Sequence, residues 1–202
     1  MSSFDSGEFP TEIDSLMASV KFDINNIDVV ADFAQDFLNG GLHGLALQSP
    51  EGVALFKDMY DQMWDRIANV LLSKDAPWRH QELPENKIVH LFESIWDLHE
   101  SPEHGQIAIA VFCISFNDDK SEGVCREIFG TTSYFGKNEL QRTIASICND
   151  GNFCKFGSAD HTAQFLMKFI SVTYSHILLS TDESLYDKDT WLNAIRDSLK
   201  NS

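Results

Sequence analysis

The chain has 202 residues, of which 43% are hydrophobic and 11% aromatic, enough to bury one core without disulfides or metal ions. Its 31 acidic and 15 basic side chains give a formal net charge of −16, which would repel a phosphate backbone unless one face concentrated the cations. No run approaches the roughly 20 apolar residues of a membrane span, and the start of the chain resembles no secretory signal. We therefore expect a globular, cytoplasmic protein.

The four cysteines, Cys113, Cys125, Cys148 and Cys154, form no CxxC pair and are too few for the disulfide framework of a secreted protein. We expect them to be reduced thiols in the core.

Apolar residues recur at three- and four-residue steps, the spacing of amphipathic helices, and strand patterns are scarce. Ser49-Pro50-Glu51 and Ser101-Pro102-Glu103 place a capping residue before proline, which is typical of a helix start. The fold class is therefore predicted to be all-α. We expect helices at about 10–20, 27–38, 50–73, 85–99, 103–117, 121–149, 159–180 and 187–200, with a further short helix at 42–47.

The connecting segments 73–83, 149–158 and 180–185 are too short and too mixed in composition to be domain linkers. The segment 163–179 is apolar nearly all round, which is typical of a central or interface helix, and the helix at 187–200 has a single apolar stripe. Two such helices predict a four-helix seam between two copies of the chain. The candidate dimer-interface residues are Phe165, Phe169, Ile170, Thr173, Ile177, Trp191 and Ile195.

The order of the motifs matches a known layout. The stretch from residues 30–35 through residues 49–56 is laid out as a helix, a turn, a reading helix and the entry to a fourth helix. Residues 140–153, followed by Ala159, have the pattern of a helix that ends at a glycine before the next helix begins. This layout, which covers most of the chain, resembles the TetR family of transcriptional regulators.

The resemblance implies a TetR-like architecture with two parts. Residues 1–48 would form a small three-helix unit of the helix-turn-helix type, and residues 49–202 would form a helical regulatory and dimerisation domain. It also implies an apolar ligand pocket between the body helices, although aromatic residues at helical spacing could equally be ordinary core. The candidate pocket residues are Trp64, Trp96, His99, Phe112, Phe116, Tyr134, Phe135 and His176.

The N-terminal unit departs from the family in its charge. Within residues 1–56 the only Lys or Arg is Lys21, against nine Asp or Glu. A helix-turn-helix needs phosphate contacts to stay in the major groove and polar side chains to read bases. The degenerate reading helix offers neither, and it consists of Asn39, Gly40, Gly41, Leu42, His43 and Gly44. We therefore expect direct nucleic-acid binding to have been lost.

No catalytic or metal motif stands out. His90, Glu93 and Asp97 share a helix face, but one face cannot close a tetrahedral metal site, so a solvated polar face is the simpler interpretation. Cys148 and Cys154 flank a glycine turn near His161, yet few cations are close enough to activate a thiolate. GxSxG and P-loop motifs are absent from the sequence, so we predict no enzymatic activity and no cofactor.

Three functions remain open. The first is a dimeric TetR-like regulator that has lost DNA binding and acts through protein contacts, for example as an antirepressor that meets a basic DNA-binding protein. The second is a ligand-responsive, DNA-binding transcriptional regulator. The third is a small-molecule binding or sensing protein whose ligand is small and apolar.

Overall fold

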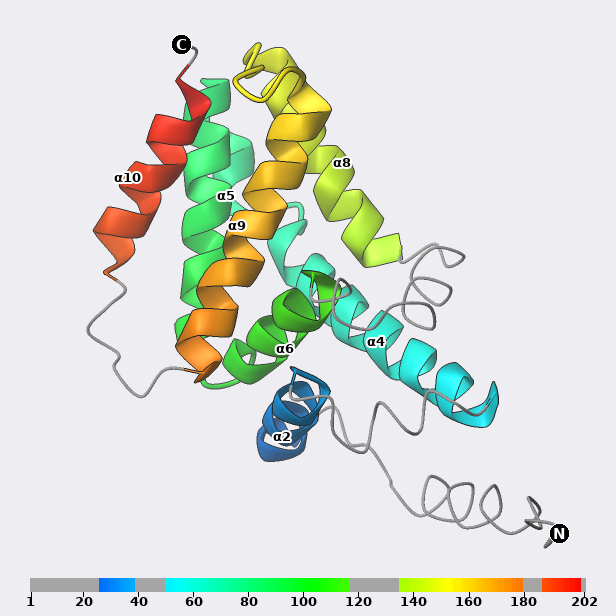
Figure 1. Cartoon of the computed structure of the whole chain (residues 1–202). Helices are drawn as coiled ribbons and strands as arrows, with labels where there is room; N and C mark the ends of the chain where they lie inside the picture. Colours follow the sequence, from blue (N-terminus) through cyan, green and yellow to red (C-terminus); the bar gives the residue numbers. More distant parts are fainter. Residues whose placement is uncertain (1–25, 39–49, 117–134, 180–186, 201–202) are drawn as a thin grey trace, which may run out of the picture.

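The computed structural model describes residues 26–38, 50–116, 135–179 and 187–200, and these residues are almost entirely helical (Figure 1). They contain no strand, so the predicted all-α fold class is confirmed for this part of the chain. None of the described helices has the length and apolar character that crossing a membrane requires. The helices are α2 (Ile27–Leu38), α4 (Pro50–Leu71), the 3₁₀ helix η1 (Pro77–His80), α5 (Pro84–Glu100), α6 (Gly105–Phe116), α8 (Phe135–Asp150), α9 (Ala159–Leu179) and α10 (Lys188–Leu199).

Most predicted helices that fall on described residues have the predicted bounds to within two residues. The expected helices at 10–20 and 42–47 lie outside the described residues, as does the first part of the helix expected at 121–149. The helix expected at about 103–117 is α6, which begins at Gly105 and ends at Phe116, within two residues of the expected bounds.

The turn before α6 brings the start of this helix close to the end of α5. Residues 102–104 form a turn, and the backbone N–H of Gly105 donates to the carbonyl oxygen of Ser101 at 2.7 Å. A Cβ atom on Gly105 would lie 2.4 Å from the carbonyl oxygen of His99, so only glycine lets α6 approach the end of α5 this closely.

The central helix is α6, which packs against α2, α4, α5 and α9 (Figure 1). Its sequence is apolar at nearly every position, and all its residues from Ile107 to Ile114 are buried. A helix that is apolar on every side needs neighbours on every side. This requirement accounts for its place between the N-terminal helices and the rest of the bundle.

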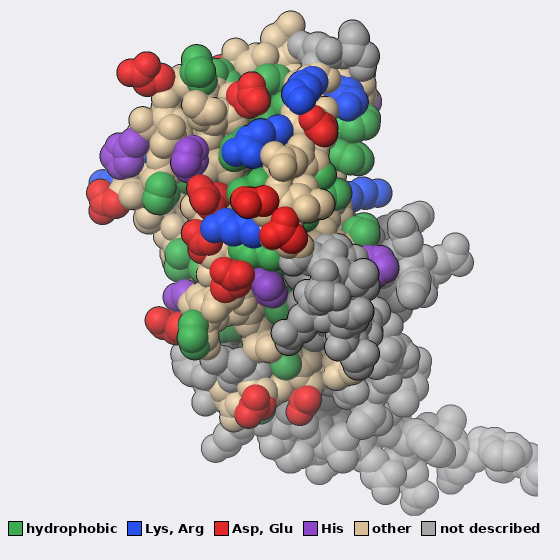
Figure 2. Space-filling view, turned by 90° about the vertical axis from the view of Figure 1, so that its left-hand side faces the viewer, with side chains coloured by type: hydrophobic (Ala, Val, Ile, Leu, Met, Phe, Trp, Pro, Cys, Tyr) green, Lys and Arg blue, Asp and Glu red, His purple; other side chains and the backbone are tan. Residues whose placement is uncertain are grey.

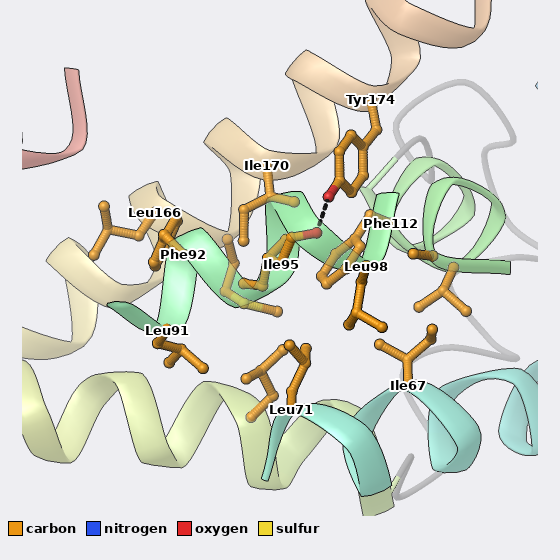
Figure 3. Close-up of a cluster of buried hydrophobic side chains, with 14 of the residues drawn as sticks. Ile67, Leu71, Leu91, Phe92, Ile95, Leu98, Phe112, Leu166, Ile170 and Tyr174 are labelled. Atoms are coloured by element: carbon orange, nitrogen blue, oxygen red, sulfur yellow. Dashed lines mark hydrogen bonds between the residues drawn. The ribbon is translucent and has the colours of Figure 1, made fainter. Parts of the chain in front are cut away.

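A buried hydrogen bond joins α9 to α5 inside the core. The phenol O–H of Tyr174 on α9 donates to the carbonyl oxygen of Ile95 on α5 at 2.7 Å, among side chains from α4, α5, α6 and α9 (Figure 3). Tyr174 is fully buried, and burial raises its pKa well above the usual value. The hydrogen bond therefore satisfies a hydroxyl that would otherwise be costly to bury. The labelled neighbours are Ile67, Leu71, Leu91, Phe92, Ile95, Leu98, Phe112, Leu166 and Ile170.

The connections are capped by local hydrogen bonds. At the end of α8, Asn152 has a φ of 53°, and the N–H of Phe153 donates to the carbonyl oxygen of Cys148 at 2.8 Å, which is a Schellman ending. At the end of α4, the indole N–H of Trp78 donates to the carbonyl oxygen of Leu71 at 2.8 Å. Arg79 donates to the carbonyl oxygen of Leu72 at 2.9 Å. The connecting segment 73–83 thus caps α4 with the buried Trp78.

Candidate functional site

Four of the predicted pocket residues lie in or beside the core in a chain of ring contacts. Trp64 and Phe112 meet edge to face with centroids 5.3 Å apart, and Phe112 lies 5.5 Å from Tyr174. His99 lies 5.4 Å from Tyr174 and 5.4 Å from Trp96. These separations are those of packed aromatic pairs, so this part of the set is arranged as core.

The His99 side chain is the polar exception in this cluster. Its Nδ1 atom is buried and has no hydrogen-bond partner among the described residues, and the same holds for Nδ1 of His104 and Oε1 of Gln106 at the same α5–α6 junction. Burial lowers the pKa of His99, and the nearby carboxylate of Glu100 opposes this effect. A neutral imidazole is thus favoured at this position.

The other predicted pocket residues do not join this cluster within the described part of the chain. His176 is exposed on α9. Tyr134 and the side chains of Phe116 and Phe135 lie outside what the structure describes.

The predicted dimer-interface residues are divided between the core and the surface. Ile170, Thr173, Trp191 and Ile195 are at most 4% exposed and pack inside a single chain, because α10 folds back against α5 and the side chain of Phe169. Phe169 is half-buried, and the side chain of Ile177 lies outside the described part. Phe165, at 38% exposure, is the member of this set that a second molecule could reach.

The polar face of α5 holds α10 in place. Nζ of Lys188 lies 2.6 Å from Oδ1 of Asp97 and 3.5 Å from Oε1 of Glu93, and Nδ1 of His90 lies 3.0 Å from Oε2 of Glu93. Among the described residues, no group of three His, Cys, Asp or Glu side chains is arranged to hold a metal ion. This face therefore makes an ion-pair contact between α5 and α10, through Asp97 and Lys188, which are 91 residues apart in sequence.

The cysteines differ in burial. Cys113 and Cys148 are buried, and burial raises the pKa of Cys148 to about 12. Cys154 is exposed in the α8–α9 turn, so the expectation that it belongs to the core was wrong. Cys125 lies outside the described residues.

The described part of the N-terminal region has an acidic surface. Asp28 and Asp32 are exposed on α2, which contains no Lys or Arg, and Asp58 and Asp65 are exposed on α4. The pKa of Asp61, between them on α4, is raised mainly by burial, with Lys57 opposing the shift and the neighbouring Asp65 and Asp58 adding to it. On the face drawn in Figure 2, acidic side chains extend to the lower end, where no described Lys or Arg is visible.

A groove lies at the other end of the bundle, between α10, α9 and the α8–α9 turn. It has a volume of about 340 Å³ and is lined by Lys155, Phe156, Phe165, Phe169, Ala194, Ile195, Asp197 and Ser198. The sequence did not predict this groove. The feature of the sequence that could have indicated it is Phe156, an aromatic residue within an otherwise polar and glycine-containing turn.

The degenerate reading helix, Asn39 to Gly44, lies outside the described residues.

No protein-family model, curated protein or solved structure matches the chain.

Proposed function

We propose that this protein is a dimeric, TetR-like regulator that has lost direct DNA binding and acts by contact with a basic protein. The observation that carries the proposal is that α2 and α4 each expose carboxylates, Asp28 and Asp32 on α2 and Asp58 and Asp65 on α4. These exposed carboxylates attract a positively charged partner and repel a polyphosphate.

The nearby cations offset this negative charge only in part, because α4 sets the exposed Lys57 and the half-buried Arg66 against these carboxylates. On α4, Arg66 is placed 3.6 Å from Glu103, so part of its charge is matched locally. The region before α2 is also acidic by sequence, with Lys21 as its only cation. A DNA-binding regulator, the alternative function, would need phosphate contacts that residues of this kind do not supply.

Charge reversal tests the proposal. The double variant Asp28→Lys with Asp32→Lys is compared with Asp75→Lys with Glu82→Lys, which changes two exposed acids by the same amount in the η1 region. Each tagged protein is used for affinity capture from the native cells, with the retained proteins quantified by mass spectrometry. We expect a basic protein to be retained by the wild type and the control pair, released by salt, and lost from the α2 variant.

The DNA alternative is tested in parallel. A mobility shift with the chain's own upstream DNA is measured at about 50 mM salt, where electrostatic attraction is least screened. We expect no shift for the wild type. A shift there, or equal capture of the basic protein by both charge-reversed pairs, would contradict the proposal.

A further inference from the structure

The groove at the α10 end of the bundle has apolar walls that the rest of the fold holds in place. Phe156 and Phe165 are each 38% exposed and stack with their ring centroids 4.2 Å apart. Phe165 lies 6.3 Å from Phe169, and Phe169 lies 6.0 Å from the buried ring of Trp191, all at small interplanar angles. Because this row of rings runs from the surface into the core, the groove wall is formed before any ligand arrives.

The two charged side chains that line the groove, Asp197 and Lys155, have different partners. The carboxylate of Asp197 is 2.6 Å from Nζ of Lys200, and this hydrogen bond lowers the pKa of Asp197. Lys155 instead donates to the backbone carbonyl oxygen of Asp197 at 3.0 Å. Lys155 also lowers the pKa of Asp197 through its charge, but among the described residues no carboxylate lies within salt-bridge distance of its ammonium, which keeps two further N–H donors.

The segments that supply the groove are, over their whole length, far less acidic than the rest of the chain. Residues 151–179 and 187–200 together hold five Lys or Arg and four Asp or Glu, against 15 and 31 in the whole sequence. On the face in Figure 2, Lys and Arg side chains at the upper end lie beside both exposed hydrophobic side chains and acidic ones. An anion is therefore repelled less here than at the α2 and α4 surface.

We propose that this groove binds a small apolar monocarboxylic acid, with its hydrocarbon part against Phe156, Phe165 and Phe169 and its carboxylate on Lys155. The volume of about 340 Å³ is at the lower end of the range of small-molecule sites, so the ligand is a single ring or a short chain. A charge-assisted hydrogen bond to Lys155 selects the acid over a neutral analogue of the same shape. This site lies on other helices than the proposed contact with a basic protein and does not depend on it.

The full chain is tested with 4-phenylbutyrate as the probe, and with 4-phenylbutanol and 4-phenylbutylamine as neutral and cationic analogues. Binding is measured by titration with ligand-observed NMR. Because the site is half-open, we expect the acid to bind about five to ten times more tightly than the alcohol, and the amine to bind most weakly.

Three variants locate the site. Lys155→Met should reduce binding of the acid to the level of the alcohol, while Lys74→Met, which changes an exposed lysine in another turn, should leave it unchanged. Phe165→Ser should weaken the acid and the alcohol alike. Ala194→Trp should fill the groove from α10 and abolish binding, with circular dichroism confirming the fold. Equal affinities for the three probes, no saturable binding of the acid, or equal losses in Lys155→Met and Lys74→Met would overturn the proposal.

Discussion

The helices α6 and α10 have the same length, 12 residues, but they are held in the fold in different ways. In α6 every residue from Ile107 to Ile114 is buried against four other helices. In α10 a single stripe that includes Trp191 and Leu192 is buried, and the opposite face is exposed. Burial alone therefore fixes α6, whereas α10 needs further contacts to fix its position along the bundle.

Those further contacts are polar and lie near the start of α10. The carboxylate of Asp187 accepts a hydrogen bond from the N–H of Thr190 at 3.0 Å and caps the helix. The indole N–H of Trp191 donates to Oγ1 of Thr173 at 3.1 Å, and Lys188 pairs with Asp97. A helix with one apolar stripe can slide or detach, and directional contacts of this kind limit both movements.

The largest difference between the two regions should follow from truncating one buried side chain in each. Phe112→Ala on α6 removes a ring that contacts Trp64 and Tyr174 and should cost about 3–5 kcal/mol of unfolding free energy. Leu192→Ala on α10 should cost about 2–3 kcal/mol, because this position is at the edge of the core and can relax. Urea denaturation followed by circular dichroism measures both.

The control for this pair is Val70→Ala, at a position that is 40% exposed and should change stability by less than about 0.5 kcal/mol. If Leu192→Ala proved as costly as Phe112→Ala, α10 would have to be part of the central core, and the contrast between the helices would be wrong.

The hydroxyl of Thr173 should matter more to α10 than to α6. Thr173→Val leaves the buried indole N–H of Trp191 without its acceptor and should cost about 1–3 kcal/mol. Thr173→Ser keeps the oxygen and should cost less. Hydrogen exchange should be faster in the α10 amides of the valine variant and unchanged in α6. Equal acceleration in both helices would show that α10 does not open by itself.

The sequence predicted the helices that apolar periodicity and proline starts define, among them α2, α4 and α9. It also predicted the one-sided burial of α10, because Trp191 and Leu192 share its apolar stripe with the residues that follow at helical spacing. These features depend only on residues that are close together in the sequence, so they can be predicted without knowing the fold.

What the sequence did not predict depends on contacts between distant residues. The pairing of Lys188 with Asp97 joins positions 91 residues apart, and no local pattern indicates it. The burial of Ile170 and Thr173 within one chain, rather than between two, depends on where α10 docks. The groove formed by Lys155 and Phe156 with α10 was missed for the same reason.

Mild acid should lower the stability of the protein through His99 on α5 before it affects the contacts of α10. Burial lowers the pKa of His99 in the folded state, so below about pH 6.5 the unfolded chain takes up a proton that the folded chain resists. Stability is therefore fully present above that pH and is lost as the pH falls towards the folded pKa, by at most about 1.4 kcal/mol per pH unit. His99→Gln should reduce this loss in thermal melts between pH 7.5 and 5.5, while the exposed His80→Gln should not. Equal pH dependence in both variants would exclude His99 as the cause.

The smallest effect is expected from the ion pair that holds the start of α10. The pKa of Lys188 is raised mainly by its hydrogen bond to Asp97, so its contribution to stability is present below about pH 10.5 and is lost as the pH rises through the folded pKa. The Lys188 side chain is 32% exposed and that of Asp97 57%, so solvent screening limits Lys188→Met to a loss of less than about 1 kcal/mol at neutral pH. The control Lys168→Met, at an exposed position on α9, should lower the unfolding free energy by less. In 1 M salt most of the difference between the two variants should disappear. Urea denaturation measures both variants with and without the added salt. A loss that persisted in salt would mean that the aliphatic stem of Lys188, and not its charge, holds α10 against α5.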